Sequence, residues 1–168
     1  MTKEDEIIRD IITALERYAL GDIKKSRAYS KPPHNQNMLL ATFILCSCFI
    51  DQMAQIRYYK KSEKVKVGAR FKLFVKTYFG SRYKPKLMYD SLRSRLVHNY
   101  SVQGHYELDD HRKYKHLSKV NDRVYLNIDD FISDIEVVWQ KLKNDLLNDK
   151  DTRKHALEHE DDYPILRE

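Results

Sequence analysis

The sequence predicts an all-α fold, an up-down bundle of about five helices with a small β-hairpin insertion near residues 105–128. Three observations predict it. Apolar residues recur at helical spacing along most of the chain, only four glycines and four prolines interrupt 168 residues, and alternation typical of strands is confined to one short segment. A chain of this length is expected to form one domain whose core removes roughly 70 % of the unfolded surface from water.

The first predicted helix has one apolar stripe and recognisable ends. Thr2 is placed to cap its start, and Gly21 is placed to end it. Residues 22–34 then form a polar, basic connection, and Pro32 and Pro33 prevent a helix from crossing it. The stripe consists of Ile7, Ile8, Ile11, Ile12, Leu15 and Tyr18, which follow the i, i+3, i+4 spacing of a buried helix face.

The second predicted helix, from about residue 35 to residue 59, is apolar on nearly every side. Such a helix is either the central one of a bundle or is also covered by a second subunit. Asp51 is the exception, and we expect it either on a narrow exposed edge or paired with a cation. Cys46 and Cys48 point to opposite sides of the helix, which favours two buried free thiols in a reducing cytosol. The most apolar part, residues 38–50, is too short to span a bilayer.

Two further helices are expected in the middle of the chain. The third predicted helix covers roughly residues 65–79, and Gly80 and Ser81 break it. The fourth starts near Pro85, a residue suited to the first helical turn, and runs to about Tyr100. The apolar residues that support these two helices are Phe71, Leu73, Phe74, Val75, Tyr78, Leu87, Met88, Leu92 and Leu96.

The last third of the chain combines two short strands, one helix and an acidic end. Residues 106–108 and 124–128 have the composition of strands and are expected to pair as a hairpin with a long tip. The fifth helix, residues 129–148, has a clean apolar stripe. Residues 149–168 are acid-rich and poor in large apolar groups, so a frayed helix or a mobile tail is expected there. The chain is thus predicted to divide into a helical domain, residues 1–148, and an acidic tail.

Charge is distributed unevenly along the chain, whose formal net charge is +6. Residues 57–95 contain thirteen Lys or Arg and only two acids, whereas residues 144–168 contain eight acids and four bases. A basic middle segment is typical of a surface that binds phosphate. The acidic end is suited to shield this surface when no phosphate is bound. The alternative is that the basic residues form only a solvated helix surface. The candidate RNA-binding residues are Arg57, Lys60, Lys61, Arg70 and Arg95.

The most informative motif is Arg-x4-His-x-Tyr, formed by Arg93, His98 and Tyr100 near the end of the fourth predicted helix. Arginine binds phosphate oxygens and histidine transfers protons near neutral pH, so together they are suited to cleave a phosphodiester without a metal. On an ideal α-helix the two residues are separated by about 140°. They therefore meet only if the helix end unwinds or a second subunit supplies opposing copies. The alternative is that His98 and Asn99 only close the helix, with His98 favourable at its negative end.

The segment from Arg93 to Tyr100 resembles the signature of the HEPN superfamily, in the form found in HepT-like toxins. The resemblance implies a helical homodimer with facing motifs that acts as a metal-independent endoribonuclease in toxin–antitoxin, abortive-infection or other antiphage systems. It implies Arg93 and His98 as the catalytic pair, and Tyr100 as the tyrosine that a partner nucleotidyltransferase antitoxin adenylylates. Asp51 matches an acid that orients the arginine.

Two features depart from the family pattern. Ser94 stands where the family usually has Asn, Asp or His, so Ser94 and Asn99 are expected to have only supporting roles, and residues 105–127 are not part of the minimal fold. Many HEPN-like proteins lack activity, so a module that binds nucleic acid or a partner protein is the alternative function. No cofactor and no membrane contact is expected. No metal site is expected either, because His155 and His159 form only a weak candidate pair for zinc. The N-terminus lacks the pattern of a signal peptide, which predicts a cytoplasmic protein.

Overall fold

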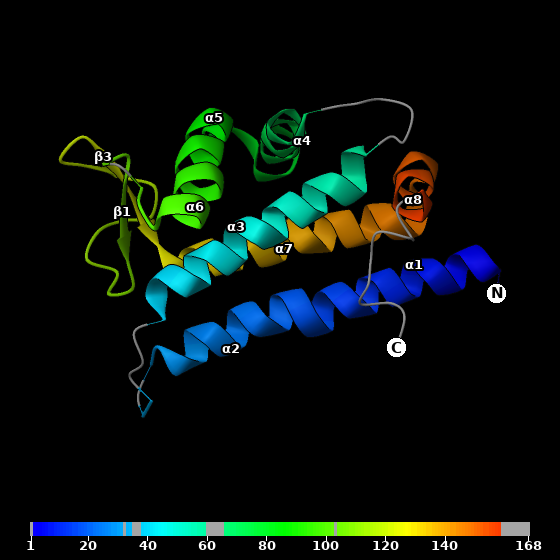
Figure 1. Cartoon of the computed structure of the whole chain (residues 1–168), viewed down its shortest axis with the longest axis horizontal. Helices are drawn as coiled ribbons and strands as arrows, with labels where there is room; N and C mark the ends of the chain where they lie inside the picture. The colour runs from blue at the N-terminus through cyan, green and yellow to red at the C-terminus, as the bar shows by residue number, and fades with distance from the viewer. Residues whose placement is uncertain (1, 32, 35–37, 60–65, 103, 159–168) are drawn as a thin grey trace.

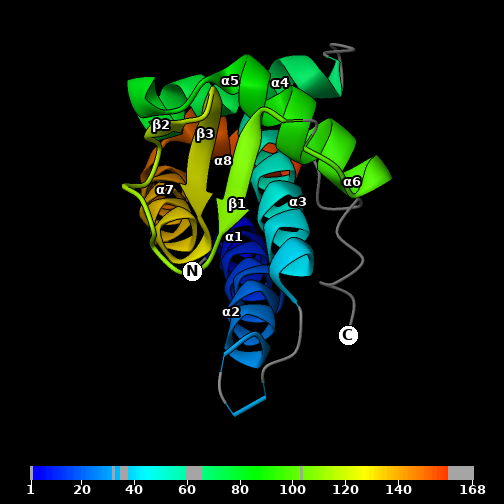
Figure 2. The same ribbon diagram turned by 90° about the vertical axis from the view of Figure 1, so that its left-hand side faces the viewer.

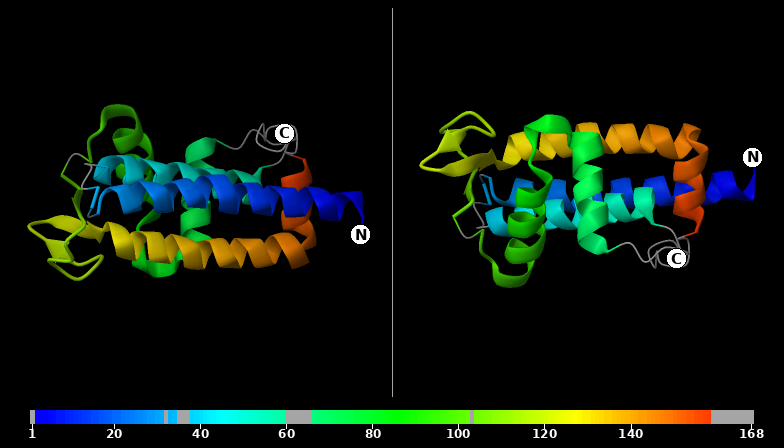
Figure 3. Two further views of the ribbon diagram at one scale, coloured as in Figure 1. Left: turned by 90° about the horizontal axis from the view of Figure 1, so that it is seen from below. Right: turned by 90° about the horizontal axis from the view of Figure 1, so that it is seen from above.

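Long helices lie side by side along the molecule, shorter helices cross them, and a small sheet closes one end (Figure 1 and Figure 3). The computed structural model describes residues 2–31, 33–34, 38–59, 66–102 and 104–158. The α-helices are α1 (Lys3–Ala14), α2 (Gly21–Tyr29), α3 (Leu39–Tyr58), α4 (Val67–Phe74), α5 (Pro85–Leu87), α6 (Val97–Asn99), α7 (Ile128–Asn148) and α8 (Lys150–Leu157). Three stretches are π-helical, η1 (Leu15–Leu20), η2 (Val75–Phe79) and η4 (Met88–Leu96), and η3 (Gly80–Arg82) is a 3₁₀ turn. The strands are β1 (Tyr106–Asp109), β2 (Lys119–Val120) and β3 (Arg123–Asn127), so a predominantly helical fold is confirmed.

The first helix is longer than the sequence predicted. α1, η1 and α2 form one continuous rod (Figure 1), because Gly21 keeps ordinary right-handed helical angles, with φ −59° and ψ −44°. The expectations that Gly21 ends the helix and that a connection begins at residue 22 are therefore wrong. Burial explains the continuation, since Ile23, Ser26 and Arg27 all face the interior. The favourable burial of this face outweighs the weak helix propensity of one glycine.

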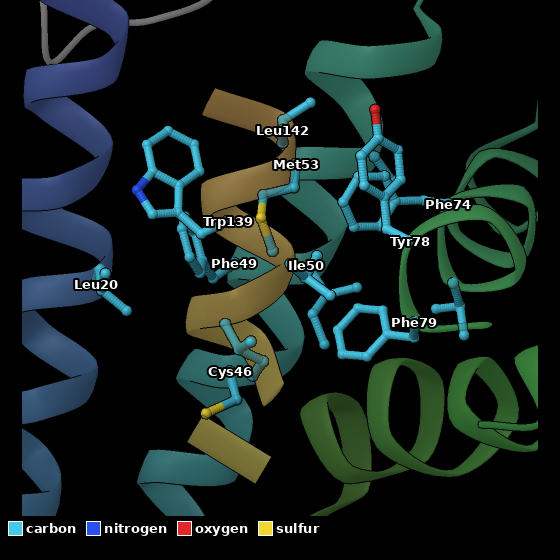
Figure 4. Packing of buried hydrophobic residues seen from close by; sticks show 14 of the residues in the cluster. Leu20, Cys46, Phe49, Ile50, Met53, Phe74, Tyr78, Phe79, Trp139 and Leu142 are labelled. Atoms are coloured by element: carbon cyan, nitrogen blue, oxygen red, sulfur yellow. The ribbon is translucent and has the colours of Figure 1, made fainter. Parts of the chain in front are cut away.

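α3 is a central helix, as its uniformly apolar sequence predicted. It packs against α2, α4, α7, α8 and η4. Phe49 of α3 lies against Trp139 of α7, with the ring centroids 5.8 Å apart, and Met53 is fully buried in the same core (Figure 4). Tyr78 and Phe79 of η2 cover the core on the other side of α3 (Figure 4). Helices from both halves of the sequence therefore share one core around α3.

The length of the apolar segment does not exclude a membrane span, contrary to the expectation from residues 38–50. α3 extends over 20 residues and is long and apolar enough, by length and composition alone, to cross a membrane. Half of its apolar stretch is buried inside the protein. The packing of α3 against six other helical segments accounts for the buried half of this stretch.

The third and fourth predicted helices are confirmed. η2 continues α4 and ends at Gly80, whose φ of 71° is easily adopted by glycine. α5, η4 and α6 form one helix from Pro85 to Asn99, and both of these helices cross the long ones (Figure 3). η4 packs across α3, so the predicted motif lies on the apolar helix that carries Asp51.

The segment after the motif forms a three-stranded sheet in the order β1-β3-β2, not the predicted hairpin (Figure 2). β1 pairs with β3 in parallel, with Tyr106 opposite Val124. The hairpin is formed by β2 and β3 instead, and its turn residues Asn121 and Asp122 both have positive φ, as a tight type I′ turn requires. Strand-like composition located β1 and β3 but gave no information on their relative direction. β2 occupies one edge of β3, and β1 pairs along the other edge, where it runs parallel to β3.

The start of the predicted acidic tail is a packed helix. The Asp149 side chain caps α8 by accepting a hydrogen bond from the Thr152 amide at 2.8 Å. Thr152 and Ala156 are fully buried, and α8 contacts α1, α3 and α7. The expectation of a frayed helix or a mobile tail is therefore wrong for residues 150–157, because small side chains let this short helix pack closely without large apolar residues. Residues 159–168 of the predicted tail lie outside the described part of the chain.

Candidate functional site

The motif helix lies directly on α3, where Asp51 meets it. Arg93 of η4 donates a hydrogen bond from Nε to Oδ2 of Asp51 at 2.8 Å. Each of the two side chains keeps 23 % of its surface exposed. Of the two environments expected for Asp51, pairing with a cation is confirmed. Because a partly exposed ion pair adds little stability, the main consequence of this contact is a fixed orientation of the guanidinium group.

The ion pair leaves most of the guanidinium group available. The hydrogen bond to Asp51 uses Nε alone, and among the residues that the structure describes no partner binds Nη1 or Nη2 of Arg93. A guanidinium group binds phosphate best through two parallel N–H donors. Asp51 therefore holds Arg93 in one orientation while its terminal nitrogens remain free to contact an anion.

The wider turn of η4 changes the angle between Arg93 and His98. η4 is π-helical up to Leu96, and the hydrogen bonds of a π-helix link residues five positions apart. Over most of the interval between the two residues, the chain therefore rotates less than in the ideal α-helix that places them about 140° apart. The angle around the helix axis between the two residues is thus smaller than on an ideal α-helix, without any unwinding of the helix end. Within the described ranges, no hydrogen bond joins them.

His98, Asn99 and Tyr100 lie at the exposed end of the motif helix. α6 ends at Asn99, and Tyr100 stops the helix with a left-handed backbone conformation, φ 52° and ψ 33°. All three side chains are exposed, and Tyr100 keeps 70 % of its surface exposed. Ser94 is half-buried next to Arg93. Neither Arg93 nor His98 is sealed inside the bundle, as a purely structural role would require.

Arg57, a predicted RNA-binding residue, is committed to contacts within the protein. Its Nε donates a hydrogen bond to the Tyr78 hydroxyl at 3.1 Å, and its Nη2 lies 4.0 Å from a carboxylate oxygen of Asp149. The backbone carbonyl of Arg57 also accepts a hydrogen bond from His155 at 2.9 Å. These contacts join α3, η2 and α8, and they argue against a role of Arg57 in binding RNA.

Two other predicted RNA-binding residues, Arg70 and Arg95, are half-exposed. The Arg70 guanidinium is 5.5 Å from the ring centroid of Tyr59, in a cation–π contact, and Arg95 on η4 is half-exposed. Lys60 and Lys61 lie outside the described residues. Arg95 is thus the RNA-binding candidate that lies on the same helix as the catalytic candidates.

Cys48 is a neighbour of the site that the sequence reasoning missed. It lies three residues before Asp51 on α3 and is exposed, whereas Cys46 is buried, so the expectation of two buried thiols is wrong for Cys48. Partial burial raises the pKa of the Cys48 thiol, the charge of Arg93 lowers it, and the charge of Asp51 raises it. The i, i+3 spacing of Cys48 and Asp51 is the sequence signal that points to this proximity.

Metal ligands are not grouped in the part of the chain that the structure describes. There, histidines, cysteines and carboxylates form no cluster of three or more that could hold a metal ion. His155, half of the weak zinc pair, donates its Nδ1 hydrogen to a backbone carbonyl instead, and His159 lies outside the described residues.

Comparisons with known proteins add no family or fold assignment. A scan against protein-family models matched no family, and searches of curated proteins and of solved structures found no match. A functional hypothesis for this chain therefore depends on its own residues: the Arg93–Asp51 contact, the exposed His98 and the basic segment around them.

Proposed function

We propose that this protein is a metal-independent endoribonuclease of the HEPN type, which acts as a homodimer in the cytoplasm, as the toxin of a toxin–antitoxin or antiphage system. One observation carries the proposal. Asp51 orients Arg93 with its terminal nitrogens free, and His98 is exposed at the end of the same helix. The two side chains supply a phosphate ligand and a proton carrier, the two groups that metal-free cleavage of RNA requires.

In the proposed reaction, RNA supplies its own nucleophile. Neutral His98 removes the proton of a ribose 2′-hydroxyl, and the resulting oxygen attacks the adjacent phosphorus. Arg93 binds the non-bridging oxygens and stabilises the negative charge that develops on them in the transition state. The bond from phosphorus to the 5′-oxygen breaks as the protonated imidazole of the second subunit donates its proton to that oxygen. The products are a 2′,3′-cyclic phosphate and a 5′-hydroxyl.

The outer face of α3 supports the homodimer. Leu40, Ile44 and Cys48 follow one another at intervals of four residues, so they lie on one face of the helix, and none of them is fully buried. This face leads along α3 towards Asp51. A second copy packed on it would cover these side chains and bring a second Arg93 and a second His98 to the same groove.

Tyr100 supports the HepT-like form of the proposal. Its side chain is 70 % exposed directly after the motif helix, and its hydroxyl is therefore accessible to a partner enzyme. Adenylylation there would add a negatively charged phosphate two residues from His98. Such a group would repel RNA and occupy Arg93, which accounts for neutralisation by a nucleotidyltransferase antitoxin.

The alternative function is an inactive HEPN-like module that binds nucleic acid or a partner protein. The contact between Arg93 and Asp51 favours it, because this contact satisfies part of the guanidinium group without any substrate. Such a module would bind RNA in a salt-sensitive manner through its basic segment, and removal of the imidazole would not change that binding.

The deciding experiment is cleavage of a labelled RNA by the purified dimer in the presence of EDTA. We expect cleavage to persist with chelator and to yield cyclic phosphate ends. His98→Ala and Arg93→Ala should each lower the rate at least 100-fold, because proton transfer and charge stabilisation each contribute this much or more. The matched control is His111→Ala, which removes an exposed histidine on the loop after β1.

Two results would overturn the nuclease proposal. The first is RNA that stays intact with a folded dimer free of any antitoxin. The second is cleavage that His98→Ala leaves unchanged. RNA binding without cleavage that survives His98→Ala would instead establish the binding module.

A further inference from the structure

A cavity of about 290 Å³ lies between the start of the motif helix and the sheet. Lys84 and Leu87 line it from the helix side, and Tyr106 and Val124 line it from the sheet side. Its volume is near the lower end of the range for small-molecule pockets, about 300–1,000 Å³. Leu87 precedes His98 by eleven residues, roughly 16 Å along a helix. The cavity is therefore separate from the candidate active site.

The rim of the cavity is cationic. Arg82, Lys84 and Lys119 reach it, and Asp122 is the one carboxylate among the described residues that line it. Asp122 pairs with Lys119 at 2.6 Å, and Arg82 pairs with Asp134 at 3.4 Å. Within the described ranges Lys84 has no ion-pair partner, and its side chain is exposed. Among the described residues the rim thus presents one ammonium group without an ion-pair partner, together with two paired cations, a set suited to a compact anion.

Tyr106 supplies an unused polar group inside the cavity. The residue is only 2 % exposed yet lines the cavity, and within the described ranges its hydroxyl has no hydrogen-bond partner. Burial is the cause that raises the pKa of this phenol. Tyr106 thus brings a hydroxyl to the wall of the cavity, where a polar atom of a ligand can pair with it.

Tyr83, the second tyrosine that lines the cavity, has a fully used hydroxyl. It donates a hydrogen bond to Asp134 at 2.7 Å and lies 2.9 Å from Nε2 of His116. The Asn127 amide donates to Nδ1 of His116, so the imidazole hydrogen is on Nε2 and points to the Tyr83 oxygen. Tyr83 is therefore a fixed wall, and of the two tyrosines Tyr106 is the one able to recognise a ligand.

We propose that this cavity binds a small phosphate monoester that carries a flat ring. The phosphate lies at the rim against Lys84, in the positive potential of the neighbouring cations. The ring lies between the aliphatic side chains of Leu87 and Val124, and a polar atom of the ligand pairs with the Tyr106 hydroxyl. The ligand is a small molecule, because the cavity has no room for a polymer.

The proposal is tested by isothermal titration of the purified full chain with adenosine 5′-monophosphate and with phenyl phosphate at low salt. We expect both monoesters to bind. Adenosine, which lacks the phosphate, and inorganic phosphate, which lacks the ring, should each bind at least tenfold more weakly. The proposal is overturned if neither monoester binds at millimolar concentration, or if inorganic phosphate binds as tightly as the two esters.

Matched variants locate the site. Lys84→Ala should weaken binding about tenfold, and Tyr106→Phe should weaken it several-fold, since it removes only the hydroxyl. Lys86→Ala, two residues further along and exposed, and His98→Ala should leave the affinity unchanged. Equal losses in Lys84→Ala and Lys86→Ala would show attraction by overall charge alone, and a loss in His98→Ala would place the ligand at the motif; either result overturns the proposal. Because Lys84 is exposed, Lys84→Ala should fold normally. It therefore tests the proposal even if Tyr106→Phe does not fold.

Discussion

Two arginine–aspartate pairs hold different parts of this protein, and they are built differently. Arg27 of α2 is 7 % exposed and binds Asp129 of α7 with two parallel hydrogen bonds, of 2.8 Å from Nε and 2.9 Å from Nη2. Its Nη1 donates to Asp110 at 3.2 Å. Arg93, by contrast, makes one hydrogen bond to Asp51, and both side chains remain partly exposed.

The comparison shows that the same two residue types serve two purposes. Around Arg27, all three guanidinium nitrogens are used, and the cluster joins α2, α7 and the loop after β1. A buried, fully used guanidinium group can fix helices but has no donor left for a ligand. Around Arg93, one nitrogen fixes the orientation, and the other two have no partner among the residues that the structure describes. The four predictions below test this difference, from the largest expected effect on stability to the smallest.

Arg27→Ala should lower the free energy of unfolding by about 3–5 kcal/mol, because it leaves the carboxylates of Asp110 and Asp129 without their cation in a partly buried site. Arg93→Ala should lower it by less than about 1 kcal/mol, since its pair is partly exposed. Urea titration followed by circular dichroism measures both. Equal losses in the two variants would show that the pairs do not differ in role.

Acid should weaken the Arg27 cluster. The hydrogen bonds from Arg27 lower the pKa of Asp129 from 3.8 to about 2. Because the folded-state pKa is the lower one, this carboxylate stabilises the fold above pH 4, and the contribution is lost as the pH falls from about 4 to about 2. We expect it to be about 1–2 kcal/mol, because solvent screens the partly exposed carboxylate. Thermal melts of the wild type should therefore fall more steeply across this range than melts of Asp129→Asn.

Asp51→Asn removes the charge at the second pair but keeps an oxygen acceptor. It should change the free energy of unfolding by less than about 1 kcal/mol. RNA cleavage should nevertheless fall roughly 10- to 100-fold, because the orientation of Arg93 is lost. Parallel urea titrations and cleavage assays separate the two effects. A large loss of stability with unchanged specific activity would assign Asp51 to the fold instead of the site.

Salt should change the coupling energy of the two pairs to different extents, and this is the smallest of the four expected effects. A double-mutant cycle on Arg93 and Asp51 should give a coupling energy of a few tenths of a kcal/mol that approaches zero in 1 M NaCl. The coupling between Arg27 and Asp129 should persist, because ions screen a buried pair much less. A salt-resistant coupling at Arg93 would indicate a buried structural pair and would count against its role in binding phosphate.

Much of the fold could be predicted because the sequence patterns that indicate a helix involve residues close together in the chain. The stripes of α1 and α7, the apolar α3 and the end of η2 at Gly80 all depend on residues within a few positions of one another. Errors arose where distant contacts overrode local preference. Gly21 continues a helix because Ile23 and Arg27 are buried, and α8 forms because Thr152 and Ala156 fit closely against neighbouring helices.

The candidate site divides in the same way. The spacing of Arg93, His98 and Tyr100 and the acid at Asp51 were visible in the sequence, and so was the chemistry of each side chain. The hydrogen bond that orients Arg93 could not be predicted from the sequence, because it joins residues 42 positions apart on two crossing helices. The cavity beside Tyr106 was not visible either, because the parallel pairing of β1 with β3 creates it.

The sequence by itself determined most of the helical segments, which residues carry reactive groups and where positive charge accumulates, because these properties depend on side-chain type and near neighbours. Only the tertiary structure decided which arginine nitrogens bind carboxylates, which side chains line the cavity and which strands run parallel. Those outcomes depend on contacts between residues far apart in the chain, and no local pattern specifies them.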